Sequence, residues 1–341
     1  MQKPTIAITA PGFCSHSPDL FNELKSRFNV KVLKSIPFTA GEDELVAALK
    51  DIDGVVLGLQ NFTRKVIEGI SNLKIICRYG IGFENVDVKA ASSRKIIVTC
   101  TRGVREEISV AEHTIALILA AAKKIPTANS FSLSGKWATS PSERPQLSGR
   151  ELYEKVLGVI GLGNIGKKVA EIAKNGFKMT VTAYDPYIDE REFVNLGVKK
   201  AENLEELIKS SDIITLHAPL TNETYHLIDK NMFEKMKKDV IIVNTARGAL
   251  IDESALYEFL KNNPQASAAL DVLSDEPPRI DNPLMSLPNI IITPHTAAFT
   301  HEALNRMDKV IIEDLTNFFF NKKLPPTERI VNKEILQNYV L

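Results

Sequence analysis

The stretch VLGVIGLGNIGKKVAEIAKNGF, residues 156–177, is the most informative part of this chain about its fold. It opens with an apolar run that predicts a strand and closes with the apolar spacing of a helix. Between them stand Gly161, Gly163 and Gly166 in the pattern G-x-G-x-x-G. In this context the first glycine permits a tight turn, the second lets the backbone approach a pyrophosphate, and the third lets the helix pack on the strand. The helix N-terminus would offer N–H groups and a positive dipole end to phosphates, so we predict a dinucleotide-binding fold.

An acidic residue, Asp185, ends the next predicted strand. It follows Gly166 by 19 residues, close to the roughly 20 residues expected in a dinucleotide fold. A carboxylate there accepts hydrogen bonds from a ribose 2′-hydroxyl but repels a 2′-phosphate. The following residues, Pro186-Tyr187-Ile188, offer no arginine to bind such a phosphate. The sequence therefore predicts NAD rather than NADP as the cofactor.

Two series of short apolar runs alternate with helical patterns along the chain, whose 341 residues suggest about two domains. Near-continuous apolar strands are typical of parallel sheets covered on both faces, so we predict an α/β protein with two doubly wound parallel-sheet domains. The first series has strands at 5–10, 30–35, 54–59, 74–79 and 96–100, with helices at 17–28, 41–50 and 63–71. The second has strands at 156–161, 179–185, 212–218, 240–246, 266–272 and 289–295.

A long apolar segment lies between the two series. It begins at Ser109 and runs to Ile125 without glycine or proline, which predicts a helix buried on most sides. Residues 126–150 then turn polar and rich in serine, proline and glycine around Trp137, so we interpret them as a boundary. A last helix is expected over about 300–320, followed by a short irregular tail.

The composition excludes several classes of function. Lys+Arg and Asp+Glu both number 42, so the net charge is zero and neither nucleic acid nor an anionic membrane is an expected partner. Three scattered cysteines are too few for a disulfide framework or a metal site and fit a reducing compartment. No run approaches the roughly 18 apolar residues of a membrane span, and the N-terminus lacks the pattern of a signal peptide. We therefore expect a soluble, cytoplasmic protein without a bound metal.

Three charged residues follow strands of the second series. They are Arg247, Glu276 and His295, each placed shortly after a predicted strand. Because ligands bind at the carboxyl ends of strands in open parallel sheets, all three could face the cofactor.

The motifs together resemble the D-isomer-specific 2-hydroxyacid dehydrogenase family, which includes D-3-phosphoglycerate, glycerate and hydroxypyruvate/glyoxylate enzymes. The resemblance covers essentially the whole chain. It rests on RYGIGFENVD (78–87), SVAEHTIALIL (109–119), GLGNIG (161–166), LHAPLTNET (216–224), NTARGALIDESAL (244–256), ALDVLSDEP (269–277) and TPHTAA (293–298).

This resemblance implies an NAD-dependent oxidoreductase that interconverts a D-2-hydroxy acid and its 2-oxo acid. It implies that His295 is the acid/base, Glu276 its partner and Arg247 the substrate anchor. The chemistry is reasonable, because an imidazolium can protonate the carbonyl oxygen during reduction and a carboxylate beside it stabilises that cation. The planar fork of arginine suits a carboxylate and polarises the adjacent carbonyl.

The resemblance also implies binding residues and domain roles. The backbone of Gly80, Ile81 and Gly82 would hold the substrate carboxylate. Contacts to the cofactor would come from Gly161, Gly163, Asn164, Ile165, Gly166, Asp185, Thr245, Ala246, Arg247, Asp271 and His295. A flavodoxin-like substrate domain would comprise 1–105 and 300–341, and a Rossmann-type NAD-binding domain would comprise 106–299. A homodimer is implied, with 109–150 at its interface.

Several alternatives stay open. A dinucleotide-sensing corepressor of the same fold would keep a similar residue set, whereas Glu276 argues against a formate-type dehydrogenase, which pairs its histidine with glutamine. D-3-phosphoglycerate is a possible substrate, although the loop around Gln60 lacks arginine, and Arg102, Arg105 or Lys136 would have to compensate. We interpret His113 as a buried histidine of the apolar helix, and for His217 both core packing and the nicotinamide end of the cleft remain open.

Overall fold

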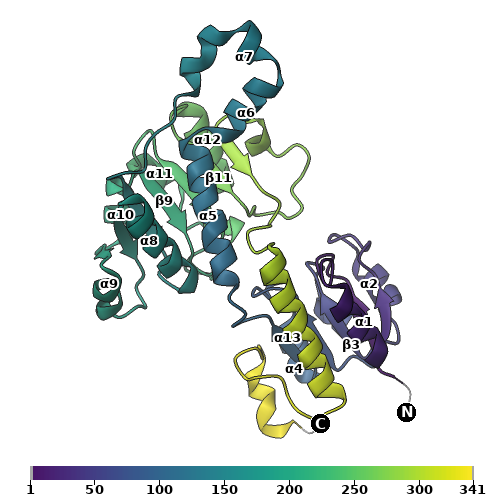
Figure 1. Ribbon diagram of the computed structural model, residues 1–341. Coiled ribbons are helices and arrows are strands. Elements are labelled where there is room, and N and C mark those ends of the chain that lie inside the picture. The colour runs from purple at the N-terminus through teal and green to yellow at the C-terminus, as the bar shows by residue number, and fades with distance from the viewer. Residues whose placement is uncertain (1–2, 340–341) are drawn as a thin grey trace. The chain divides into compact units, whose positions relative to one another are not determined.

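The computed structural model describes residues 3–339, which divide into two compact units (Figure 1). One unit comprises the described residues up to Glu106 together with those from Phe299 onward, and the other comprises Glu107–Ala298. Each unit contains one parallel sheet covered by helices on both faces, so each is described by itself below.

The first unit is built on a five-stranded parallel sheet in the order β2-β1-β3-β4-β5. This is the flavodoxin-like order, with a topological switch point between β1 and β3. Its strands are β1 (Thr5–Ile8), β2 (Asn29–Val32), β3 (Gly54–Leu57), β4 (Ile75–Arg78) and β5 (Ile97–Cys100). Its helices are α1 (Pro18–Arg27), α2 (Glu42–Ala48), α3 (Arg64–Gly69), α4 (Val88–Ser93) and α13 (His301–Phe319). Helices α1 and α13 pack on one face, and α2, α3 and α4 on the other.

The second unit has a seven-stranded parallel sheet in the order β12-β11-β10-β9-β6-β7-β8. The chain starts at β6, builds outward through β7 and β8, and then returns to the other side of β6 with β9, which is the Rossmann topology with one extra strand. The strands are β6 (Val156–Ile160), β7 (Thr180–Tyr184), β8 (Lys199–Lys200), β9 (Ile213–Leu216), β10 (Ile241–Asn244), β11 (Ser267–Leu270) and β12 (Ile290–Ile292).

Helices cover both faces of this second sheet because its central strands are apolar on both sides. Along β10, Ile241 and Val243 pack against one helical layer, whereas Ile242 between them packs against the other. The first layer comprises α5 (Glu106–Ala122), α8 (Asn164–Phe177) and α9 (Glu190–Leu196), and the second comprises α10 (Leu204–Ser210), α11 (Lys230–Lys235) and α12 (Glu253–Asn262). The predicted α/β class with two doubly wound sheets is confirmed.

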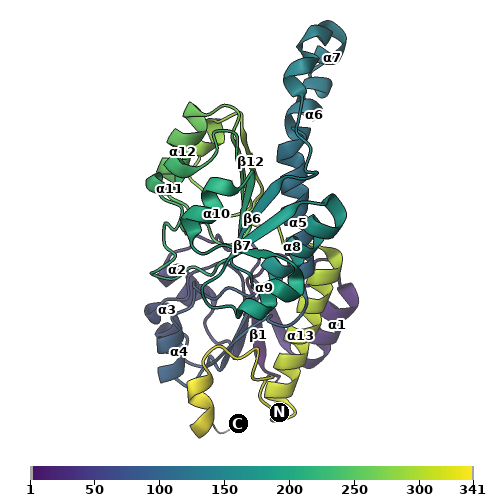
Figure 2. The ribbon, with the colours of Figure 1, turned by 90° about the vertical axis from the view of Figure 1, so that its left-hand side faces the viewer.

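The segment interpreted as a boundary lies inside the second unit, so that interpretation is wrong. It forms α6 (Ile125–Leu133), α7 (Lys136–Thr139) and a 3-10 helix over Pro141–Leu147, all within the second unit. Lys124, in the left-handed region at φ 52°, separates α6 from α5. None of these three helices buries a residue, and they project from the rest of their unit as an arm (Figure 2). Their polar composition therefore reflects exposure rather than irregular structure.

Helix α5 also begins earlier than the sequence suggested. It starts at Glu106 rather than Ser109, whose side chain is buried within the helix and so does not cap its end. Acidic residues at positions 106 and 107 are well placed for the first turn, where they complement the positive end of the helix dipole. The short strand β8 was not predicted, because two exposed lysines carry no apolar alternation.

The C-terminal tail covers the edge of the first sheet. Ile330 forms an antiparallel bridge with Thr99 of β5, and the backbone of Val331 donates to the carbonyl of Val98. The buried side chain of Asn332 accepts from the Val98 N–H at 2.9 Å and donates to the Ile96 carbonyl at 2.8 Å. These bonds satisfy backbone groups that an open strand edge would expose. In the part of the chain from residue 3 to residue 339, no helix is long and apolar enough to cross a membrane.

Candidate active site

The glycine loop after β6 has the close contacts that its motif predicts. Gly161 has φ +90°, and a Cβ there would stand 2.7 Å from the backbone nitrogen of Ala218. A Cβ on Gly166 would stand 2.1 Å from the carbonyl oxygen of Gly161, so only glycine lets α8 begin this close to the strand. In contrast, a Cβ on Gly163 would meet nothing within 4 Å. The first two constraints come from the protein itself, whereas the open space at Gly163 is where a ligand could approach.

The carboxylate of Asp185 lies beside this loop. Its Oδ2 accepts from the backbone N–H of Leu162 at 2.8 Å, and its Oδ1 accepts from that of Tyr187 at 3.0 Å. An ionised carboxylate has about four acceptor positions, so two remain for other donors. Asn164 is exposed at the start of α8, and the partly buried Ile165 follows it. The residues expected to bind the pyrophosphate and ribose are therefore adjacent, with a fixed carboxylate.

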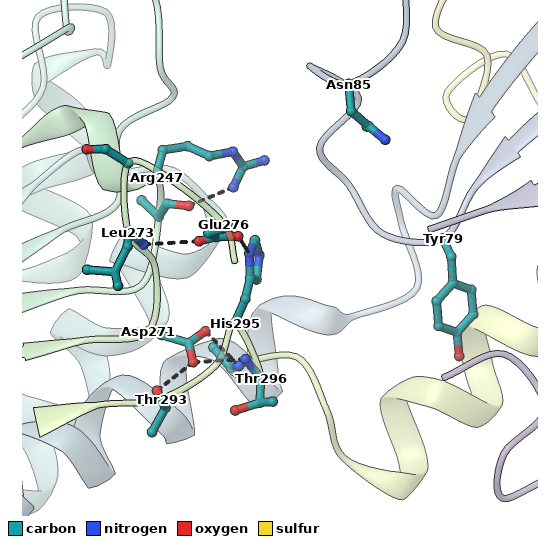
Figure 3. Close-up of polar contacts among 12 residues, drawn as sticks. Tyr79, Asn85, Arg247, Asp271, Leu273, Glu276, Thr293, His295 and Thr296 are labelled. Carbon is teal, nitrogen blue, oxygen red and sulfur yellow. Dashed lines mark hydrogen bonds and ion pairs between the residues drawn. The ribbon is translucent and has the colours of Figure 1, made fainter. Parts of the chain in front are cut away.

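His295 and Glu276 form a hydrogen-bonded pair (Figure 3). Nδ1 of His295 lies 2.6 Å from Oε2 of Glu276, whose Oε1 accepts from the Leu273 N–H at 3.0 Å. An ionised carboxylate only accepts hydrogen bonds, so Nδ1 carries the proton of this bond and Nε2 is left for exchange with a ligand. The two side chains keep 37% and 26% of their surface exposed. This arrangement is suited to acid/base chemistry at Nε2.

Arg247 lies in the loop after β10, the strand next to β11 in the sheet. The side chain of Asn244 fixes this loop, because its Nδ2 donates to the Arg247 carbonyl at 2.8 Å and its Oδ1 accepts from the Ala246 N–H at 3.0 Å. A Cβ on Gly248 would stand 2.0 Å from the backbone of Leu273, so the loop lies directly against the segment leading to Glu276. Figure 3 shows the side chains of Arg247, Glu276 and His295 close together.

A buried carboxylate, Asp271, holds the segment that carries His295. It accepts from the Thr293 hydroxyl at 2.6 Å, the Thr296 N–H at 2.9 Å and the Ala297 N–H at 2.8 Å. The carbonyl of Asp271 also accepts from the His295 N–H at 2.8 Å. His295 itself stands in the left-handed region at φ 52°. The predicted cofactor residue Asp271 therefore has a structural task that sequence reasoning missed.

His113, which we interpreted as a buried histidine, is partly buried and hydrogen-bonded within this network. Its Nε2 lies 3.1 Å from the Thr293 hydroxyl and 3.5 Å from Oδ1 of Asp271, and its side chain is 24% exposed. The next residue, Thr114, has its hydroxyl 2.9 Å from that of Thr245. The polar run Glu112-His113-Thr114, within a helix that is mostly apolar, was the signal that could have found this contact.

His217 follows β9, with its backbone against the glycine loop. Nε2 lies 3.0 Å from the Thr215 hydroxyl, while Nδ1 is buried without a hydrogen-bond partner in the described part of the chain. Burial lowers the pKa of His217 to about 3, so the ring is neutral at neutral pH. The imidazole of His217 can therefore act as a neutral polar group but not as a cation.

The predicted substrate loop lies in the other unit, after β4. Gly80 has φ +130°, and its carbonyl accepts from the Thr101 N–H at 3.0 Å, while Ile81 is exposed and Gly82 partly buried. Arg102 and Arg105 are exposed. Within residues 3–339, no group of three or more histidine, cysteine or acidic side chains is placed to hold a metal ion.

Comparison with known proteins settles the family. The model of the D-isomer specific 2-hydroxyacid dehydrogenase NAD binding domain matches residues 115–297. The chain belongs to this family. It is 46% identical over 81% of its length to D-3-phosphoglycerate dehydrogenase from Archaeoglobus fulgidus, of which the alignment covers 51%. It is 38% identical to glyoxylate reductase from Korarchaeum cryptofilum, over 86% of both chains.

Solved structures of similar proteins have the same fold. The TT0316 protein from Thermus thermophilus matches with a TM-score of 0.83 and 32% identity, over 96% of this chain and 99% of that one. D-lactate dehydrogenase from Aquifex aeolicus, complexed with NAD and lactic acid, matches with a TM-score of 0.81 and 27% identity over the same shares. The chain spans about half the length of the D-3-phosphoglycerate dehydrogenases it matches. Its second unit is thus an NAD-binding domain of this family.

Replacing two glycines of the loop should separate folding from ligand binding. Gly166→Ala drives a methyl group into a backbone oxygen, and we expect a loss of stability of about 1–3 kcal/mol. Gly163→Ala meets no protein atom, so its melting temperature should stay unchanged while NADH binds about tenfold more weakly. Thermal unfolding and NADH fluorescence titration measure the two effects. Equal NADH affinity in Gly163→Ala and the unmodified protein would contradict a pyrophosphate at this position.

Proposed function

We propose that this protein is an NAD-dependent oxidoreductase that interconverts a D-2-hydroxy acid and its 2-oxo acid. The observation that carries the proposal is the His295–Glu276 pair beside Arg247, at the carboxyl ends of strands in the NAD-binding unit. The site fits the cofactor, because the space at Gly163 admits a pyrophosphate and Asp185 retains acceptor capacity for a ribose hydroxyl. Related proteins named as dehydrogenases and reductases support an enzymatic role.

In the proposed mechanism, His295 transfers a proton through Nε2. NADH held by the glycine loop and Asp185 would supply the hydride for the reduction of the carbonyl carbon. As that carbon is reduced, the Nε2 proton passes to the carbonyl oxygen, and in the oxidation direction Nε2 takes the hydroxyl proton. Glu276 keeps Nδ1 protonated and stabilises the imidazolium form of the ring. Arg247 presents a planar fork to the substrate carboxylate and polarises its neighbouring carbonyl.

The proposed substrate class is a short acid with an oxygen on its second carbon. We propose that the backbone of Gly80, Ile81 and Gly82 binds the substrate carboxylate. Related proteins are named after both phosphorylated and unphosphorylated acids, as D-3-phosphoglycerate dehydrogenase and as glyoxylate or hydroxypyruvate reductase. Substrate profiling distinguishes among these acids. The three buried free thiols in the described chain agree with a cytoplasmic, reducing location.

The test of this function is NADH oxidation, followed at 340 nm, with glyoxylate, hydroxypyruvate, pyruvate, longer 2-oxo acids and 3-phosphohydroxypyruvate. We expect turnover with at least one of them. His295→Gln should lower kcat about 10²- to 10⁴-fold, because the proton donor is lost, while the Kd for NADH stays within about twofold. Wild-type protein that binds NADH but oxidises none with any acid would favour the dinucleotide-sensing alternative. Loss of NADH binding in the variant would contradict an acid/base role for His295.

Asp185 should set the cofactor preference. Asp185→Ala removes the charge that repels a 2′-phosphate and the acceptor for the ribose hydroxyls. We expect kcat/KM for NADPH relative to NADH to rise at least about tenfold, that is by about 1.4 kcal/mol in relative transition-state stabilisation. Steady-state kinetics with the two cofactors measure this ratio, and Asp189→Ala, on the same connection after β7, is the control. An unchanged ratio would show that another group selects the cofactor.

We further propose that the arm, formed by α6, α7 and the 3-10 helix over Pro141–Leu147, binds a second copy of this chain, with 109–150 at the interface. Ile125, Leu133 and Trp137 are 56%, 80% and 63% exposed on helices that bury no residue. Helices without a core are stable only when something covers their apolar side chains. Because the same three side chains occur on every copy, two arms can bury each other's apolar surface in a symmetric pair.

Charge on the arm should break this pair. We expect Leu133→Glu to shift the protein from dimer to monomer in sedimentation equilibrium, because a buried carboxylate without a partner is costly. The matched control is Val194→Glu, at a residue that is 73% exposed on α9. A monomeric wild-type protein, or dimers in both variants, would contradict the proposed interface.

A further inference from the structure

Two neighbouring residues of helix α5 each contact a residue that shortly precedes a different proposed catalytic side chain in the sequence. His113 contacts Thr293, two residues before His295. Thr114 contacts Thr245, two residues before Arg247. All of these residues belong to the NAD-binding unit. One turn of one helix therefore touches both segments that carry the proposed proton donor and the proposed substrate anchor.

The direction of the hydrogen bonds at His113 follows from the number of protons. The Thr293 hydroxyl has one proton, and its 2.6 Å contact with the Asp271 carboxylate uses it, because a carboxylate only accepts. Nε2 of His113, 3.1 Å from the same hydroxyl oxygen, must then be the donor. The bonds therefore run from His113 to Thr293 to Asp271.

The same reasoning identifies the donor in the hydrogen bond between Thr114 and Thr245. The Thr114 hydroxyl lies 2.7 Å from the Val110 carbonyl, which accepts its only proton. The Thr245 hydroxyl, 2.9 Å away, is then the donor to Thr114. Both hydroxyls are buried, so water does not replace either bond if it is lost.

The segment around His295 needs such support. The backbone of His295 has φ 52°, a region that residues other than glycine rarely occupy. Thr293 on one side and the N–H groups of Thr296 and Ala297 on the other are fixed to Asp271. A backbone segment held in an uncommon conformation keeps it only where its surroundings determine it strongly.

We propose that His113 and Thr114 are positioning residues, which fix the segments of His295 and Arg247 to a single rigid helix. The inference rests on the proposed function for its effect on catalysis, and it assigns the His113 side chain the task of donating one hydrogen bond through Nε2. Since a shift of about 1 Å in a catalytic group costs on the order of 10² in rate, loss of that donor should reduce turnover.

The test compares His113→Leu with His113→Gln, because glutamine can place an N–H near the position of Nε2. In the assay for the 2-oxo acid that the protein reduces, we expect His113→Leu to lower kcat about tenfold, with KM for NADH within about twofold, and His113→Gln to recover most of the loss. Thr114→Val leaves the Thr245 hydroxyl without its acceptor. Because Thr245 lies two residues before Arg247, the proposed substrate anchor, this variant should instead raise KM for the oxo acid. Equal rates in His113→Leu and His113→Gln would overturn the proposal, since packing alone would then explain the residue.

A readout without turnover separates this inference from the proposed function. The N–H groups of Thr296 and Ala297 donate to Asp271, so hydrogen exchange over 293–298 reports directly on the support of this segment. Exchange should be faster in His113→Leu and unchanged in His113→Gln, whereas the strand 156–160 should be protected equally in all variants. Unchanged exchange in His113→Leu would overturn the positioning role even in a protein with full activity. Faster exchange in a protein that reduces no 2-oxo acid would sustain the positioning role and reject only the enzymatic function.

Discussion

The buried carboxylate of Asp271 is the constraint on which the candidate active site depends. Ionised carboxylates are costly to bury unless donors surround them, and here one hydroxyl and two backbone N–H groups do so. Those donors all come from residues 293–297, so satisfying the carboxylate fixes the path of the segment that contains His295. The hydrogen bonds that stabilise the buried carboxylate of Asp271 therefore also place the imidazole ring of His295.

The close backbone contacts of glycine fix the remaining parts of the site. Gly248 brings the Arg247 loop against Leu273, and Gly161 brings the loop after β6 against His217 and Ala218. Each contact joins the ends of neighbouring parallel strands, where side chains from separate parts of the sequence must meet. A side chain larger than hydrogen at either glycine would push the strand ends apart.

The sequence predicted the fold well, because apolar runs and motif glycines are local signals. Strands such as 241–244 are apolar on both faces and can only be central. Other features depended on partners distant in the chain. His113 lies 180 residues from Thr293, so no spacing could reveal their hydrogen bond. The arm at 125–147 has polar spacing typical of a loop, and the tail at Asn332 pairs with a strand more than 200 residues away. Local patterns cannot specify such contacts.

In the His295–Glu276 pair, the placement of the two residues by the backbone matters more than the electrostatic attraction between their side chains. Both side chains are partly exposed, so water competes for this contact and the attraction between them contributes little free energy. Its 2.6 Å geometry must then come from the backbone. Glu276 is oriented by the Leu273 N–H, and His295 by the carbonyl of Asp271 and the segment that its carboxylate holds. Because both partners are fixed before any ligand arrives, the ring needs no reorganisation to present Nε2, which is the condition for efficient proton transfer.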